Sequence, residues 1–171
     1  MIADRQGFAA SDLPGAFSRP PELSSLLYLN PVARVSLERQ GEALSELPII
    51  MVVEDDQLVQ GLVEDALTEG GFEAAIAASG EEATTLLNGN GTEYRALVTD
   101  INLSGKLNGW DVARHAREID ANFPVIYMTG AAADQWPING VPNSILLSKP
   151  FAPAQLVTAL SQLLNAAPLT E

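Results

Sequence analysis

Four short apolar runs, each followed by or ending in polar residues, succeed one another along this chain in a fixed order. The runs and the residues after them are IIMVV with Glu54, Asp55 and Asp56, ALVT with Asp100, VIYM with Thr129, and ILLS with Lys149 and Pro150. Continuous apolar runs of this length are typical of strands covered on both faces, as in a parallel sheet. The polar ends then gather at one edge of the sheet, where open α/β sheets bind ligands.

Helical patterns alternate with these runs, which indicates an α/β fold. The predicted strands are Ile49–Val53, Phe72–Ala77, Ala96–Thr99, Val125–Met128 and Ile145–Leu147, and the predicted helices are Gln57–Glu69, Gly80–Asn88, Trp110–Ile119 and Pro153–Leu164. Apolar residues recur at helical spacing in the first helix (Leu58, Leu62, Val63, Ala66, Leu67), and in the third we expect Val112, Ala113, Ala116 and Ile119 to face inward. The expected architecture is a five-stranded parallel sheet, doubly wound, with helices on both faces.

One crossover lacks a clear helix. Between Thr129 and Lys149 the chain carries Pro137, Gly140 and Pro142, which break helices. We expect at most a turn or two here, so the fourth helix is short or irregular and the segment mobile.

The folded domain is predicted to span residues 48–166. Residues 1–47 hold scattered prolines and serines without a sustained apolar period, so we interpret them as an N-terminal extension, mobile or loosely docked. Residues 167–171 are interpreted as a C-terminal tail.

Composition excludes several classes of protein. The chain has no cysteine, so disulfides, thiolate zinc sites and cysteine nucleophiles are ruled out. A formal net charge of −13 argues against binding to nucleic acid. No apolar run approaches the roughly 20 residues of a membrane span, and the N-terminus does not have the pattern of a secretory signal. A cytoplasmic location without membrane contact is the expectation.

The polar strand ends predict chemistry with phosphate. Carboxylates that share one point cannot all stay ionised without a counter-charge, and a divalent cation supplies one. Mg²⁺ fits best because it prefers oxygen ligands. A lysine and a hydroxyl beside such a metal suit a phosphoryl group, so the pattern predicts a phosphoryl acceptor.

Taken together, these markers resemble the receiver domain of two-component response regulators, a chemotaxis-protein-like fold of the flavodoxin type. The resemblance covers about Pro48 to Asn165 and rests on the acids after the first strand, Asp100, Thr129, and the sequence Lys-Pro-Phe that begins at Lys149.

The resemblance implies a role for each site residue. Asp100 matches the phosphoacceptor, with Thr129 as the conserved-position hydroxyl and Lys149, before a usually cis proline (Pro150), as the phosphate-binding lysine. The implied ligands of Mg²⁺ are Asp55, Asp100, Glu54 through water, and the backbone carbonyl of Asn102.

The resemblance also implies a function. The chain is expected to be a stand-alone receiver phosphorylated by a histidine kinase or a histidine phosphotransfer protein. It would then bind a downstream protein, or act as a phosphate shuttle or sink. We class it as a signalling protein and not as an enzyme.

Three departures from the family pattern bear on output. The loop after Asp100 is one residue longer than the commonest form and has Ser104 where proline is usual. Leu146 stands where a switch aromatic residue is common, although Tyr127 lies close enough in the pattern to substitute for it. The weak fourth helix is the third departure. In many receivers this helix is part of the face through which the domains dimerise.

Two alternatives stay open. A haloacid-dehalogenase-type phosphohydrolase also uses a strand-end aspartate, a hydroxyl, a lysine and Mg²⁺, but it needs a second aspartate where this chain has Asn102. A pseudo-receiver would be a binding module that never takes phosphate, and the complete set of site residues argues against it. A P-loop nucleotidase is excluded because no GxxxxGK[ST] sequence is present.

Overall fold

The structure is a computed structural model that describes residues 46–166. The chain divides into two units, Met1–Ser45 and Glu46–Glu171. The predicted tail, residues 167–171, and all but the last two residues of the predicted extension, residues 1–47, lie outside the described residues. Their proposed roles stay predictions.

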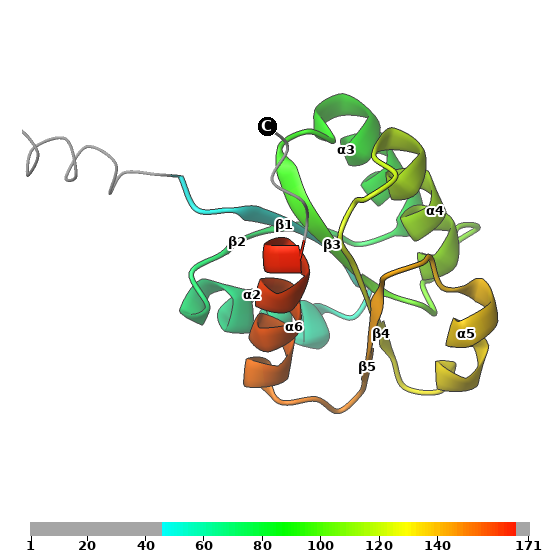
Figure 1. The fold of residues 1–171 in the computed structure, drawn as a ribbon. Coiled ribbons are helices and arrows are strands. Elements are labelled where there is room, and N and C mark those ends of the chain that lie inside the picture. Colours follow the sequence, from blue (N-terminus) through cyan, green and yellow to red (C-terminus); the bar gives the residue numbers. More distant parts are fainter. Residues whose placement is uncertain (1–45, 167–171) are drawn as a thin grey trace, which may run out of the picture. The chain divides into compact units, whose positions relative to one another are not determined.

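The centre of the described unit is a five-stranded parallel sheet (Figure 1). Its strands are β1 (Ile49–Val53), β2 (Glu73–Ala77), β3 (Tyr94–Asp100), β4 (Val125–Thr129) and β5 (Ile145–Ser148). The spatial order is β2-β1-β3-β4-β5, with every neighbouring pair parallel. The predicted doubly wound α/β fold is therefore confirmed.

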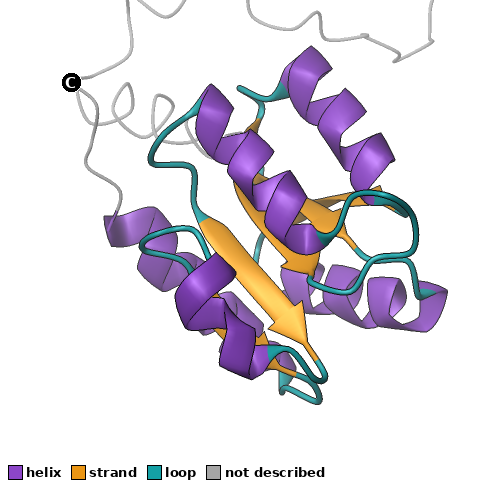
Figure 2. Ribbon diagram, turned by 90° about the vertical axis from the view of Figure 1, so that its right-hand side faces the viewer, coloured by secondary structure: helices purple, strands orange, loops and turns teal. Residues whose placement is uncertain are grey.

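Helices cover both faces of the sheet (Figures 1 and 2). They are α2 (Gln57–Glu69), α3 (Gly80–Asn90), α4 (Gly109–Ile119), α5 (Trp136–Asn139) and α6 (Pro153–Ala166). Helices α2 and α6 pack on one face, over a core that includes Ile50, Val98 and Leu160. Helices α3 and α4 pack on the other face, over a core that includes Met51 and Leu97. Alternate residues of β1 enter different cores, so β1 is apolar throughout, as the sequence indicated, and β3 is apolar from Ala96 to Val98.

Helix α2 ends where its sequence predicts. Gly71 has φ of +81°, a conformation that favours glycine. The N–H of Gly71 donates to the Thr68 carbonyl and the N–H of Phe72 to the Leu67 carbonyl, which is the Schellman pattern of helix ends. Phe72 and Leu67 are both buried in the same core, so the turn also directs the chain into β2.

Three apolar residues at helical spacing face solvent. In α2 only Val63, Ala66 and Leu67 are buried, whereas Leu58 and Leu62 are 81% and 68% exposed. The prediction that Ile119 faces inward is wrong, because this last residue of α4 is 41% exposed. The α2 helix therefore buries only a narrow stripe of its surface, and Ile119 lies at the exposed C-terminal end of α4.

The β4–β5 crossover is short, as predicted. It contains a 3₁₀ turn at Ala133–Gln135 and the single-turn helix α5. The Tyr127 hydroxyl accepts a hydrogen bond from the Val141 N–H at 3.2 Å, and Tyr127 itself is fully buried. Mobility of this segment stays a prediction.

Within residues 46–166, no helix is both long enough and apolar enough to cross a membrane.

Candidate functional site

The candidate site lies where the winding of the sheet reverses. From β1 the chain goes to β2 on one side, and then returns to β3 on the other side. The helices that follow β1 and β3 therefore diverge to opposite faces, which leaves a crevice at the carboxyl ends of these strands. Glu54 and Asp55 directly follow β1, and Asp100 is the last residue of β3.

Three predicted carboxylates meet at this crevice. Glu54, Asp55 and Asp100 each offer an oxygen, and these oxygens all lie within 4.8 Å of one another. Glu54 is 1% exposed and Asp100 is 8% exposed, whereas Asp55 is half-buried. The fourth acid, Asp56, serves another purpose, because its carboxylate caps α2 by accepting the Leu58 N–H at 2.8 Å.

Lys149 joins the two buried acids. Its Nζ donates to Glu54 Oε2 at 2.6 Å and to Asp100 Oδ2 at 3.1 Å. The backbone places this lysine as well, because its N–H donates to the Thr129 carbonyl at 2.7 Å. The following Lys149–Pro150 peptide bond is cis. The lysine thus reaches across the sheet from β5 to the ends of β1 and β3.

The pKa values of this group follow from burial and pairing. Burial raises the pKa of Glu54, although the hydrogen bond from Lys149 acts in the opposite direction. Burial also acts to lower the pKa of Lys149, but its bonds to Glu54 and the charge of Asp100 outweigh burial, so the net pKa is raised. A lysine with a raised pKa stays cationic at neutral pH. The ammonium group is therefore a fixed positive charge beside Asp100.

Thr129 ends β4 at the same edge and is 1% exposed. Its Oγ1 accepts hydrogen bonds from the N–H groups of Ala131 at 3.1 Å and Ala132 at 2.8 Å. A hydroxyl that accepts in this way still has its own proton to donate. The structure therefore places Thr129 at the predicted edge, but among the described residues its hydroxyl bonds to the following loop and not to Asp100.

Asn102 lies in the turn directly after β3 and is exposed. Its N–H donates to Asp100 Oδ1 at 3.4 Å. The contact shows that the backbone at residue 102 lies beside the Asp100 carboxylate, and the family resemblance implies a metal-ligating carbonyl at this residue.

Ser104 contacts Asp55, and the sequence did not predict this contact. Its N–H donates to Asp55 Oδ2 at 3.1 Å, and its hydroxyl donates to the same oxygen. The side-chain hydrogen bond from Ser104 is the main cause that lowers the pKa of Asp55. The sequence marked this position as a departure from the family pattern, but a contact between residues so far apart along the chain has no local signal.

The residues of the cluster fit a divalent metal ion. All ligand atoms that they offer are oxygens, which Mg²⁺ prefers. The three carboxylates and the Lys149 ammonium leave two negative charges, which a divalent cation balances. Asp55 is only half-buried, so the cluster is accessible to solvent on that side.

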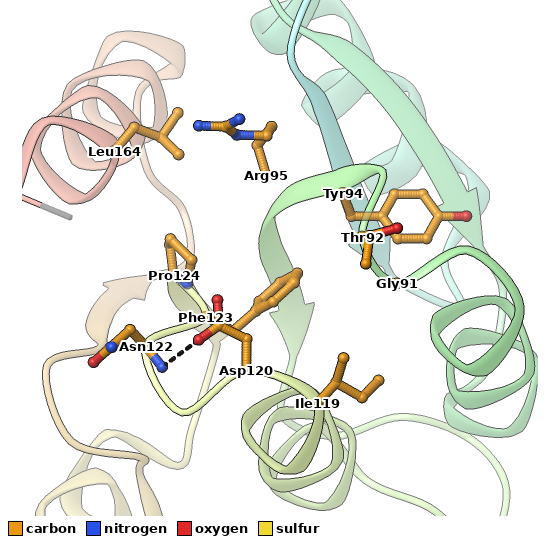
Figure 3. A pocket seen from close by; sticks show the side chains of 10 residues that line it. All are labelled: Gly91, Thr92, Tyr94, Arg95, Ile119, Asp120, Asn122, Phe123, Pro124 and Leu164. Atoms are coloured by element: carbon orange, nitrogen blue, oxygen red, sulfur yellow. Dashed lines mark hydrogen bonds between the residues drawn. The ribbon is translucent and has the colours of Figure 1, made fainter. Parts of the chain in front are cut away.

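A second hollow lies at the opposite end of the sheet (Figure 3). It has a volume of about 380 Å³. Most of its lining residues lie at the start of β3 or in the segments that precede β3 and β4, among them Arg95, Asp120 and Phe123. In Figure 3 the Asn122 N–H donates to the Asp120 carboxylate, at 2.8 Å. The hollow is separated from the carboxylates by the length of the strands, so it is not part of the candidate site.

Comparison with known proteins agrees with this geometry. The family model described as the response regulator receiver domain matches residues 50–161. No match was found among the curated proteins.

Solved structures of receivers resemble the chain. A response regulator receiver protein from Sinorhizobium medicae WSM419 is 45% identical, with a TM-score of 0.68, over 71% of this chain and 97% of that chain. The receiver domain of sensor histidine kinase PA1611 from Pseudomonas aeruginosa PAO1 is 25% identical, with a TM-score of 0.62, over 71% of this chain and 100% of that chain. That structure has a magnesium ion coordinated in its active site cleft.

The fold is shared more widely. Chemotaxis protein CheY4 from Vibrio cholerae is 21% identical, with a TM-score of 0.62, over 69% of this chain and 99% of that chain. Because the family model covers more than half of the chain, and because the acids and the lysine meet at the expected edge, the chain belongs to the response regulator receiver family of two-component systems.

Proposed function

We propose that this chain accepts a phosphoryl group on Asp100 from a histidine kinase or a histidine phosphotransfer protein, and then signals through protein contact or acts as a phosphate shuttle or sink. The observation that carries the proposal is the cluster in which Lys149 bonds both Asp100 and Glu54, with Asp55 within reach of the same point. The proposed place of action is the cytoplasm. Receiver domains are generally signalling modules without enzymatic activity, and we place this chain among them.

In the proposed transfer, a carboxylate oxygen of Asp100 forms a bond to phosphorus as the bond from phosphorus to the donor imidazole nitrogen breaks. The electron pair of that bond returns to the imidazole ring. Repulsion between Asp100 and the incoming phosphoryl group opposes this approach, and the Lys149 ammonium, already 3.1 Å from Asp100 Oδ2, offsets it. The Thr129 hydroxyl can turn its proton toward a phosphoryl oxygen.

Mg²⁺ would be held by Asp55, Asp100, the Asn102 carbonyl and, through water, Glu54. When bound, it neutralises charge on the acceptor carboxylate and on the phosphoryl oxygens. Glu54 suits an indirect role because its Oε2 already accepts from Lys149 at 2.6 Å.

Two alternatives make different predictions. A phosphohydrolase of the haloacid dehalogenase type would turn over a generic phosphatase substrate, and the position where it needs a second aspartate is the exposed Asn102. A pseudo-receiver would fail to bind beryllofluoride, an analogue of the phosphoryl group. A titration with beryllofluoride therefore separates it from the proposed function.

The direct test is phosphorylation with acetyl phosphate followed by intact-mass measurement. We expect one phosphoryl group per chain only when Mg²⁺ is present, and none on the variant Asp100→Asn. The matched control is Asp56→Asn, because Asp56 caps α2 and asparagine caps a helix about equally well. This control should be labelled like the wild type. Stoichiometric labelling of Asp100→Asn on another residue would show that the assignment is wrong.

A further inference from the structure

Ser104 connects two strands' ends across the candidate site. It lies in the β3–α4 loop, 49 residues after Asp55, and donates two hydrogen bonds to Asp55 Oδ2 from its N–H and its hydroxyl. Among the described residues, Lys149 donates to Glu54 and Asp100 but not to Asp55. Ser104 thus supplies the hydrogen-bond donors for Asp55, as Lys149 does for the two buried acids.

The loop that carries Ser104 is held from its other side. The Lys106 N–H donates to Glu81 Oε1 at 2.8 Å, which fastens the loop to the first turn of α3. Gly105 between them has φ of +126°, which lets the chain turn from one carboxylate to the other. Ser104 is therefore presented by a fastened backbone and not by a freely moving loop.

Asp55 needs such a partner to point into the site. It is the most exposed of the three clustered acids, and the charges of Glu54 and Asp100 repel it. A half-buried carboxylate that is repelled by two neighbours gains solvation by turning away from them. Two donors on one oxygen hold the side chain in place and leave Oδ1 for a cation.

We propose that Ser104 is a positioning residue for the metal ion: it holds Asp55 in the orientation that binds Mg²⁺ and joins the end of β1 to the loop that carries Asn102. The inference rests on the metal site of the proposed function. Partners that orient metal ligands in this way typically change metal affinity by about 10- to 100-fold when removed.

The test measures Mg²⁺ binding to the full chain by calorimetry, without phosphate donor. Ser104→Ala keeps the backbone donor and removes the hydroxyl, and we expect it to weaken Mg²⁺ binding by about tenfold, the lower end of that range. Ser104→Thr restores a hydroxyl at the same atom and should recover most of the affinity. In an Asp55→Asn background, Ser104→Ala should have little further effect, because the two residues act through one contact.

The outcomes are distinguishable. If the wild type binds Mg²⁺ and Ser104→Ala binds it equally or more tightly, Ser104 competes with the cation or is indifferent to it, and the inference is wrong while the proposed function stands. Loss of affinity in both Ser104→Ala and Ser104→Thr would also overturn it, because the hydroxyl would then not be the cause. Absence of Mg²⁺ binding by the wild type would overturn this inference together with the metal step of the proposed function. Circular dichroism of each variant confirms that the fold is retained.

Discussion

Gly109 allows helix α4 to begin against the end of β3. A Cβ atom at this position would lie 2.1 Å from the Asp100 carbonyl oxygen and 2.9 Å from the Ile101 Cα. Both atoms belong to the backbone and cannot move aside as a flexible side chain could. The Gly109 N–H also donates to the Ile101 carbonyl at 3.0 Å. The absence of a side chain at residue 109 therefore allows α4 to begin in close contact with the backbone of Asp100.

Substitution of Gly109 by alanine should accordingly destabilise the domain by about 1–3 kcal/mol, the usual cost of forcing extra atoms into a packed site. Gly61→Ala in α2 is the matched control, because a Cβ there meets nothing within 4 Å. That control should stabilise the helix by about 0.5–1 kcal/mol. Urea denaturation measures both changes. Equal stability of Gly109→Ala and the wild type would show that the α4 start is not constrained as described.

Helix α2 presents an apolar strip beside the site. Leu62 borders a hollow of about 380 Å³ whose other lining residues include Val59, Phe151 and Lys149, the lysine that bonds Asp100. In the proposed function, a donor protein approaches Asp100 from this end of the sheet, because Asp100 lies at the carboxyl edge. The exposed leucine is therefore placed to contact such a donor.

We expect Leu62→Glu to slow phosphoryl transfer from a phosphohistidine donor protein by about tenfold, equivalent to about 1.4 kcal/mol of docking energy. Transfer from acetyl phosphate, which needs no docking, should be unchanged. Ile138→Glu is the control, since Ile138 is 85% exposed on α5, away from α2. Phosphate transfer is followed by gel mobility. Similar slowing by the two variants would exclude a specific docking role for α2.

The β4–β5 crossover contains little regular secondary structure, but hydrogen bonds connect it to the rest of the domain. The Arg117 guanidinium of α4 donates to the Pro142 carbonyl at 2.7 Å, and the Val141 N–H donates to the Tyr127 hydroxyl at 3.2 Å. Within the crossover, the Trp136 indole N–H donates to Ser144 Oγ at 3.1 Å. Tyr127, which the sequence offered as a substitute for a switch aromatic residue, is buried beside Trp110 with 4.6 Å between ring centroids. In this structure the ring is a core residue that also holds the crossover.

At the scale of the whole domain, the proposed metal site predicts that cation binding and stability are coupled. A cation that binds the folded chain and not the unfolded chain stabilises by about 2.7 kcal/mol at a concentration 100 times its Kd. For a domain of this size that corresponds to a rise of the melting temperature on the order of 10 °C.

Mg²⁺ should therefore raise the melting temperature of the wild type, and Asp55→Asn should reduce that rise, because one of the three clustered carboxylates is lost. Differential scanning fluorimetry across millimolar Mg²⁺ measures both. Asp65→Asn is a suitable control, since Asp65 is an exposed acid of α2 outside the cluster. A wild-type melting temperature that does not change with Mg²⁺ would contradict the metal site.

The sequence predicted the strands and the four longer helices because their patterns are local. It also predicted which acids cluster, because these acids follow the strands in a fixed order along the chain. The strands contain short apolar runs, such as Ile49–Val53, and a helix can carry its own end signal, such as Gly71 after α2. Parallel strands bring their carboxyl ends to one edge, so Glu54, Asp55, Asp100 and Lys149 could be placed together before any coordinates.

Only the tertiary structure decided how these groups are paired. The bonds of Lys149 to Glu54 and of Ser104 to Asp55 span 95 and 49 residues, and their geometry depends on loop paths that no local pattern encodes. Exposure of Leu58 and Leu62 likewise depends on how much of α2 the sheet and α6 cover, since helical spacing defines a face but not the width of its burial. Sequence thus determined which chemical groups reach the sheet edge, and packing determined which of them touch.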